Sequence, residues 1–236
     1  MSRQHEFTHG ARDMLPMLLG AIPFGIIFGS LAGAAGLDPW QTQGMSLLVF
    51  AGSAQFIAIS LLSGGAGIAV VLLTTLVVNL RHALYSASMQ PHVRHLPKRW
   101  RMPLAFWLTD EAYAVVVQRY ARGDQGVYRH WYFLGAALAM YCNWQLCTLV
   151  GVLFGQAVPN IADWGLDFAM LATFIGIVVP MLRNQPQVAA ALVAGAVALL
   201  CHALPYKLGL MAAAASGIVV GVWLERRNPA LQEELA

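Results

Sequence analysis

The chain has 236 residues, of which 58% are hydrophobic and only 11% are charged, and its formal net charge is +3. Soluble globular domains carry about a quarter charged residues. This composition excludes an ordinary soluble domain and predicts a membrane protein. No linker or low-complexity tract divides the sequence, so we expect a single transmembrane domain over residues 1–236.

Several apolar runs approach or exceed the roughly 18 to 20 residues that a helix needs to cross a hydrocarbon core of about 30 Å. The sequence therefore predicts an all-α polytopic membrane protein with about seven transmembrane helices. The predicted spans are Met14–Gly36, Met45–Leu62, Ala66–Ser86, Trp131–Val158, Phe168–Leu182, Val188–Leu204 and Leu208–Leu224.

The first predicted span carries a small-residue face. Gly25, Gly29 and Gly33 recur every four residues after Pro23. Such a face lets another helix approach closely. We interpret these glycines as helix packing, and they are also a candidate seat for a partner subunit.

The second predicted span contains small and polar residues at mid-membrane depth, in the order Phe50-Ala51-Gly52-Ser53-Ala54-Gln55-Phe56. We expect the helix to be interrupted here. A later run, residues 174–180, is weakened by Pro180, which removes a backbone donor. Paired interrupted segments indicate a transporter's substrate site. Close helix packing is the alternative, but the amide of Gln55 needs polar partners in lipid. Gly52, Ser53, Ala54 and Gln55 are thus candidate substrate-binding residues.

A polar and cationic cluster, Asn79-Leu80-Arg81-His82-Ala83-Leu84-Tyr85, follows the apolar run Ile68–Val78 directly. An ionisable group at membrane depth is expensive unless it snorkels or finds a partner. Helical spacing places Asn79 and His82 on one face, and Arg81 and Tyr85 roughly on the other. We interpret Asn79 and His82 as the lining of a substrate or proton path, with His82 the natural titrating member.

Two interpretations of Arg81 stay open: snorkelling to the inner surface, or an ion pair with Asp110 or Glu111. We favour the ion pair, because an unpaired acid near a span would be costly. Arg81, Tyr85, Asp110 and Glu111 are then a candidate coupling or gating group. The two acids lie in the segment Leu104–Tyr120, which either spans the membrane or is re-entrant.

The positive charges are unevenly distributed. Arg94, Lys98, Arg99 and Arg101 lie between Pro91 and Pro103 without an acidic residue, and Arg226 and Arg227 follow the last predicted span. The positive-inside rule assigns loop 91–103 and the C-terminus to the cytoplasm. It also favours a segment 104–120 that does not cross, with the N-terminus outside. Topology explains the basic loop, so we expect no nucleic-acid binding.

A weak internal repeat links two ranges of the chain. The sequence GIIFG at 25–29 has an echo, GVLFG, at 151–155, and each is followed by a tryptophan and later by a histidine. The echo suggests three-helix halves at 14–89 and 131–224, separated by segment 90–130. They would be inverted if the intervening segment does not cross, an arrangement common in secondary transporters.

Signatures of soluble enzymes are missing from the sequence. There is no phosphate loop, dinucleotide fingerprint, HExxH or GxSxG motif, and Cys142, Cys147 and Cys201 lack metal-ligand spacing. We expect no enzyme, no cofactor and no metal. One enzymatic alternative uses His82 with Asp110 or Glu111 as acid and base, but it lacks a nucleophile.

Four motifs together resemble the AzlC family of branched-chain amino acid permeases. They are Ile22-Pro23-Phe24-Gly25, Ala51-Gly52-Ser53-Ala54-Gln55-Phe56, Asn79-Leu80-Arg81-His82-Ala83-Leu84-Tyr85 and Leu108-Thr109-Asp110-Glu111. The third and fourth motifs are the specific ones. The resemblance implies a bacterial inner-membrane exporter of branched-chain amino acids that works with a small hydrophobic AzlD-type subunit.

These observations predict a proton-coupled secondary transporter for branched-chain or similar neutral amino acids, embedded in the lipid bilayer. The alternative is a scaffold subunit that anchors a transporting partner through Gly25, Gly29 and Gly33 without transporting anything itself. The sequence leaves open the direction of transport, the coupling ion and the stoichiometry with a partner.

Overall fold

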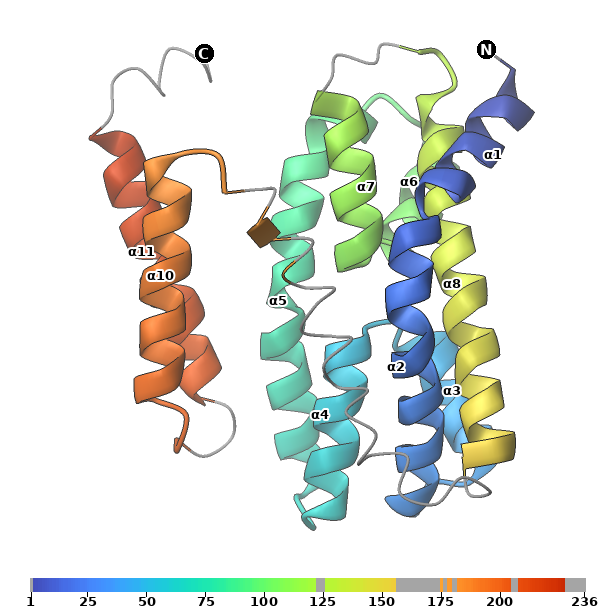
Figure 1. The fold of residues 1–236 in the computed structure, drawn as a ribbon, viewed down its shortest axis with the longest axis vertical. Coiled ribbons are helices and arrows are strands. Elements are labelled where there is room, and N and C mark those ends of the chain that lie inside the picture. Colours follow the sequence, from blue (N-terminus) through green and yellow to red (C-terminus); the bar gives the residue numbers. More distant parts are fainter. Residues whose placement is uncertain are drawn as a thin grey trace. The chain divides into compact units, whose positions relative to one another are not determined.

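The computed structural model describes residues 2–121, 126–155, 175, 178–179, 182–204 and 208–227, and its regular structure there is entirely helical. The chain forms two compact units, Met1–Phe174 and Ile175–Ala236 (Figure 1). The first unit contains α1 (Arg3–Asp13), α2 (Leu15–Ala34), α3 (Pro39–Leu48), α4 (Gly52–Ser63), α5 (Ile68–Val93), α6 (Lys98–Phe106), α7 (Asp110–Ala121) and α8 (Arg129–Phe154). The second contains a helix pair, α10 (Gln185–Leu200) and α11 (Leu208–Arg226).

The predicted class, an all-α membrane protein, is confirmed. Within the described ranges, α2, α5, α8 and α11 are long and apolar enough to cross a membrane, and they match four of the predicted spans. The predicted span Val188–Leu204 corresponds to α10, which has only 16 residues. Most of the predicted span Phe168–Leu182, including Pro180, lies outside the described residues.

The prediction that Met45–Leu62 crosses the membrane is wrong: this range belongs to a helical hairpin, α3–α4. α3 packs against α8, where Gln43 bonds to Gln145 and the carbonyl of Leu47 accepts from Tyr141, and the two helices run in opposite directions (Figure 1). The chain then breaks at residues 49–51 and returns through α4 along α5 (Figure 1). A helix of 10 residues is about 15 Å long, half of a hydrocarbon core.

Glycines in the left-handed region shape both ends of the α3–α4 hairpin. Gly36, before α3, has φ 89°, and Gly65, after α4, has φ 73°. A residue with a Cβ is strained in this region. The two turns let the chain enter and leave the hairpin at the same end of the unit.

The segment Leu104–Tyr120 is re-entrant, which is one of the two alternatives that the sequence left open. α6 descends along α8, with Trp100 against Trp131 and Trp107 against Tyr141. After a break at residues 107–109, α7 returns, and the hydroxyl of Tyr120 donates to the carbonyl of Arg129. We call this element the α6–α7 hairpin.

The two hairpins enter from opposite ends of the first unit and meet beside the middle of α8 (Figure 1). Tyr141, halfway along that helix, contacts both breaks: its ring lies 4.9 Å from Phe50 and 5.9 Å from Trp107. A long helix followed by a hairpin thus occurs twice in opposite directions, as α2 with α3–α4 and as α5 with α6–α7. This order places two interrupted segments at the same depth.

The echo between residues 25–29 and 151–155 has a packing explanation. A Cβ at Gly29 would overlap the backbone at Thr148 and Gly151, and a Cβ at Gly155 would overlap Ser30. The two motifs are therefore the facing sides of one close α2–α8 contact. These contacts also show that α2 and α8 run in the same direction, whereas inverted halves at 14–89 and 131–224 require their first helices to run in opposite directions.

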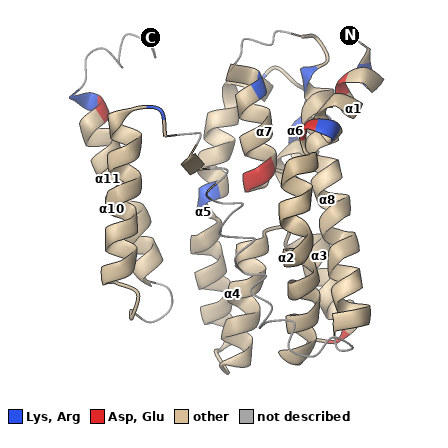
Figure 2. Ribbon diagram, viewed as in Figure 1, with Lys and Arg blue, Asp and Glu red and all other residues tan. Residues whose placement is uncertain are grey.

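The N-terminus lies at the same end of the unit as the basic loop. Arg3 of α1 and Arg99 of α6 line one cavity, and Figure 2 shows most of the first unit's Lys and Arg at this end. The positive-inside rule assigns this end to the cytoplasm. The expectation that the N-terminus and loop 91–103 lie on opposite sides is therefore wrong, because two crossings, α2 and α5, separate them.

Candidate functional site

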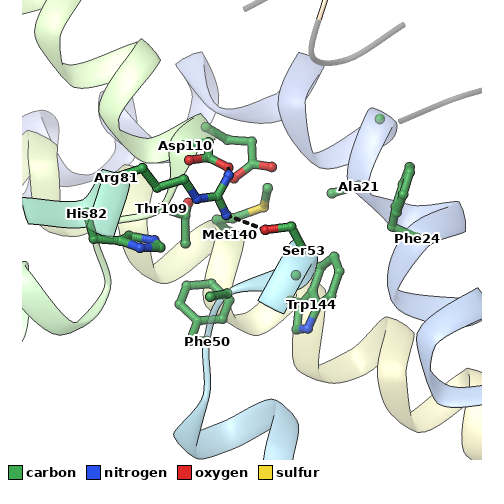
Figure 3. A pocket seen from close by; sticks show the side chains of 14 residues that line it. Ala21, Phe24, Phe50, Ser53, Arg81, His82, Thr109, Asp110, Met140 and Trp144 are labelled. Atoms are coloured by element: carbon green, nitrogen blue, oxygen red, sulfur yellow. Dashed lines mark hydrogen bonds and ion pairs between the residues drawn. The ribbon is translucent and has the colours of Figure 1, made fainter. Parts of the chain in front are cut away.

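A cavity lies where the two hairpins meet (Figure 3). Its free volume is about 50 Å³. Side chains from five parts of the fold line it: Gly20, Ala21 and Phe24 of α2; Phe50, Ala51, Gly52 and Ser53; Arg81 and His82 of α5; Thr109, Asp110 and Glu111; Met140 and Trp144 of α8. We call Phe50–Ser53 the tip of the α3–α4 hairpin and Thr109–Glu111 the tip of the α6–α7 hairpin.

The guanidinium of Arg81 joins the two tips (Figure 3). Its Nη1 donates to Oδ2 of Asp110 at 2.5 Å, and its Nη2 donates to Oγ of Ser53 at 2.7 Å. The side chains of Arg81 and Asp110 are only 24% and 9% exposed. The predicted ion pair of Arg81 with an acid of segment 104–120 is confirmed for Asp110. Its coupling or gating role stays a prediction.

The tip of the α3–α4 hairpin presents a helix N-terminus without a side-chain cap. α4 begins after Ala51, which has no side-chain oxygen to accept from the first turn. The following Gly52 is packed closely, because a Cβ there would lie 2.9 Å from the Trp144 ring. The uncapped N–H groups and the positive end of the helix dipole favour an anionic group at this point.

The tip of the α6–α7 hairpin is acidic. Thr109 accepts a hydrogen bond from the backbone N–H of Ala112 at the start of α7, and Asp110 and Glu111 follow in its first turn. Asp110 is only 7% exposed. Two buried polar atoms near the tip, Oδ1 of Asp110 and Nε of Arg81, have no hydrogen-bond partner. The site therefore keeps capacity for a polar ligand.

Not every predicted substrate-binding residue lines the cavity. Gly52, Ser53 and His82 do, and Ala54, Gln55 and Asn79 do not. The fully buried amide of Gln55 instead donates to the carbonyl of Val49 and accepts from the indole of Trp144. It satisfies a carbonyl freed at the helix break. Gln55 therefore supports the shape of the tip rather than its surface.

The residues of the cluster 79–85 do not separate fully into the two predicted faces. Arg81 and His82, expected on opposite faces, both line the cavity, because neighbouring positions on a helix can reach one cavity between them when one side chain is long. Tyr85 lies beyond it and stacks on Tyr113 with ring centroids 4.6 Å apart. The Oδ1 atom of Asn79 is buried without a hydrogen-bond partner.

Sequence reasoning did not single out the apolar residues of the site. Phe24, Phe50, Met140 and Trp144 form much of the wall, and Phe56 supports it with edge contacts to Phe24 and Phe28. Aromatic residues are common in membrane helices, so nothing in the sequence marks these above the others. Their role follows only from the depth at which the hairpins meet α8.

Two of the three glycines on the small-residue face of the first span, Gly25 and Gly29, are covered within the chain. A Cβ at Gly25 would meet Cys147, and a Cβ at Gly29 would meet Thr148. Both glycines therefore contact α8. This arrangement removes them as a free surface for a partner subunit.

Comparison with known proteins places this architecture in a family. Residues 16–158 match the AzlC protein family. The chain is similar to the inner membrane protein YgaZ of Escherichia coli, with 25% identity over 92% of this chain and 91% of the relative. It is 33% identical to an uncharacterized membrane protein of Archaeoglobus fulgidus over 94% of this chain and 97% of that protein.

A third relative bears a functional name. The branched-chain amino acid transport protein AzlC of Bacillus subtilis is 30% identical over 68% of this chain and 62% of its own length. No solved structure matches the chain. The matched range contains both hairpins and every residue of the cavity. The chain belongs to the AzlC family of membrane proteins.

Proposed function

We propose that the protein is a secondary transporter that exports branched-chain or related neutral amino acids across the inner membrane, driven by the proton gradient. The observation that carries this proposal is the cavity between two oppositely directed hairpins, which has a mostly apolar wall and a few charged and polar side chains. The name of the Bacillus relative, a branched-chain amino acid transport protein, supports the same substrate class.

The residue types that line the cavity match the chemistry of an amino acid with an apolar side chain. Ser53, Arg81 and Asp110 offer groups for an ammonium and a carboxylate, and Phe24 and Trp144 offer apolar surface. Binding sites for small molecules usually combine an apolar wall with a few placed polar groups. In this proposal Gly52, Ser53 and His82 contact the substrate, and Gln55 holds the tip in place.

The two hairpins supply the gates that alternating access requires. One hairpin separates the cavity from the cytoplasmic end, and the other separates it from the external end. Interrupted helices at the substrate site are typical of secondary transporters. We propose that each hairpin moves in turn while α2, α5 and α8 stay fixed.

Proton coupling is proposed for the acidic tip. Asp110 and Glu111 are adjacent carboxyl groups at the cavity, and His82 lies across from them. Adjacent carboxyl groups in a partly buried site rarely both stay ionised. A proton carried on this pair would weaken the hold of Asp110 on Arg81.

A small hydrophobic AzlD-type subunit is the proposed partner. The alternative, a scaffold that transports nothing, would need a free anchoring face, and α8 already covers Gly25 and Gly29. Reconstitution of the chain alone and with the partner discriminates these cases. Transport that requires both chains and depends on Asp110 supports the proposal.

Efflux from proteoliposomes tests the proposed function. Vesicles that hold the chain with its partner are loaded with labelled valine, and the initial rate is measured with and without a proton gradient. We expect gradient-dependent efflux that Asp110→Asn abolishes and that Leu80→Ala, at a 57% exposed position on α5, leaves unchanged. Efflux that is insensitive to Asp110→Asn contradicts the assigned site.

A further inference from the structure

We infer that a zwitterionic substrate binds by exchange with the Arg81–Asp110 ion pair: its carboxylate takes the Arg81 guanidinium, and its ammonium takes the Asp110 carboxylate. Before the exchange, the two charged groups satisfy each other and link the two hairpin tips. This inference rests on the proposed function and names how that site selects its ligand.

Arg81 bridges the two hairpin tips, and we call this pair of bonds the tie. Arg81 belongs to α5, which is part of neither hairpin, yet one of its nitrogens bonds to Ser53 and another to Asp110. These acceptors lie in the first turns of α4 and α7. The guanidinium presents its donors in a rigid planar fork, so it can hold both acceptors at once.

The cavity as it stands is too small for an amino acid. Its free volume of about 50 Å³ has room for a few water molecules. A substrate therefore enters only if the tips separate. Separation breaks at least one of the two bonds that Arg81 makes to the tips.

Charge balance explains why a zwitterion can open this site. The Arg81–Asp110 pair is neutral as a whole, and after exchange each group again faces an opposite charge. A free amine or a free acid would leave one buried charge unpaired, which is strongly unfavourable. The unpartnered Nε of Arg81 and Oδ1 of Asp110 can add further bonds to the ligand.

The uncapped N-terminus of α4 completes the carboxylate site. Ser53, which accepts from the guanidinium, belongs to the first turn of α4, where Ala51 provides no side-chain cap. Helix N-termini bind anions. The substrate's side chain then lies against Phe24 and Trp144, which line the same cavity.

A distance measurement tests the tie directly. Spin labels are placed at Leu48→Cys and Phe106→Cys, the last residues of α3 and α6, which are 77% and 46% exposed. The background has Cys142, Cys147 and Cys201 replaced by alanine, and the full chain is held in lipid nanodiscs with its partner. We expect a longer or broader distance distribution upon addition of leucine, and the same change in Arg81→Gln without leucine.

Matched controls separate charge at this site from charge elsewhere. Arg101→Gln removes an exposed arginine of α6 and is expected to leave the distances unchanged. Arg81→Lys keeps the charge but lacks the fork, so it should give an intermediate distribution. An unchanged distribution in Arg81→Gln overturns the tie, and a distribution that leucine does not alter overturns the exchange.

Binding of charge-deleted analogues tests the exchange itself. We expect leucinamide, which lacks the carboxylate, and 4-methylpentanoate, which lacks the ammonium, to bind roughly 10- to 100-fold more weakly than leucine. Arg81→Gln should abolish the discrimination against leucinamide, and Asp110→Asn the discrimination against 4-methylpentanoate. Discrimination that survives in both variants overturns the inference.

The outcome also distinguishes this inference from the proposed function. If leucine is not transported but another zwitterionic amino acid separates the labels, the exchange stands and the branched-chain assignment fails. If leucine is transported without any change in distance or analogue preference, the proposed function stands and the exchange fails.

Discussion

The two hairpins have the same shape and opposite chemistry. The α3–α4 hairpin is held to α8 by neutral hydrogen bonds, from Gln43 to Gln145 at 2.8 Å and between Ser46 and Thr148 at 3.0 Å. Its tip carries no charged side chain. Each such bond contributes only about 1 kcal/mol net.

The α6–α7 hairpin is held by charges. Asp110 at its tip pairs with Arg81, and Arg119 near its far end pairs with Glu6 of α1 at 3.4 Å and contacts His9. Glu6 is only 3% exposed. Removing one partner of a buried ion pair costs about 3–5 kcal/mol.

Under the proposed function, this difference predicts separate tasks for the two hairpins. Neutral bonds can be exchanged one at a time at small cost, which suits the external hairpin to frequent movement. Charged contacts change strength when a proton binds, which suits the cytoplasmic hairpin to coupling.

The largest effect is expected from the charged tip. Asp110→Asn leaves the Arg81 guanidinium buried without its counter-charge, and efflux of labelled valine should fall by roughly 100-fold or more. The matched change at the neutral tip, Ser53→Ala, removes one hydrogen bond and should lower efflux by roughly tenfold or less. Equal losses in the two variants would remove the contrast between the tips.

A second prediction concerns the cytoplasmic anchor of the α6–α7 hairpin. Arg119→Gln leaves Glu6 buried without its cation, so the unfolding temperature of the purified protein should fall clearly, in line with a loss of about 3 kcal/mol. The double variant with Glu6→Gln should recover part of the loss, because no unpaired charge remains. A double variant as unstable as the single one would show that Arg119 acts through packing alone.

A third prediction concerns the break of the α3–α4 hairpin. Gln55→Leu removes the bonds to Val49 and Trp144 and should cost about 1–3 kcal/mol. Hydrogen exchange measured by mass spectrometry should rise in residues 49–55 and stay unchanged in residues 107–113. A rise in both breaks would mean that the hairpins do not move independently.

The smallest effect is expected for the neutral contact between α3 and α8. In a double-mutant cycle, Gln43→Leu and Gln145→Leu should show a coupling free energy of roughly 0.5–1.5 kcal/mol in thermal unfolding. The control pair is Leu72→Ala with Leu84→Ala, two exposed positions on α5, which should not couple. A coupling as large as that of Arg119 with Glu6 would contradict a weakly held external hairpin.

The ion pair of the site was predictable from the sequence because an isolated charge of either sign is unfavourable inside a membrane. An arginine and an acid at membrane depth are both costly alone, which favoured a pair of Arg81 with Asp110 or Glu111, and the structure selects Asp110. The long spans α2, α5 and α8 were predictable for a similar reason, since apolar length leaves few alternatives.

The external hairpin was not predictable in the same way. Met45–Leu62 is apolar enough to span, and its composition does not reveal that the chain turns back after residue 48. The glycine motifs have an explanation that the sequence did not supply. Close packing of two helices selects small residues on both, and Gly29 and Gly151 lie in one such contact.

The residue type of Gln55 did not decide whether its amide binds a substrate or the backbone. Its burial and its need for partners were evident, but a substrate and a broken backbone satisfy an amide equally well. Only the position of the Val49 carbonyl decides between them.

The side of the membrane from which single cysteines are labelled tests whether the two hairpins enter from opposite ends and meet at one cavity. In intact cells and a cysteine-free background, a membrane-impermeant thiol reagent is applied to Trp40→Cys and Ser63→Cys, at exposed positions on either side of the external break. Lys98→Cys in the basic loop is the cytoplasmic control. We predict that Trp40→Cys and Ser63→Cys both label from outside, and that Lys98→Cys labels only after permeabilisation. Labelling of Trp40→Cys and Ser63→Cys from opposite faces would show that residues 45–62 cross the membrane and would contradict the account.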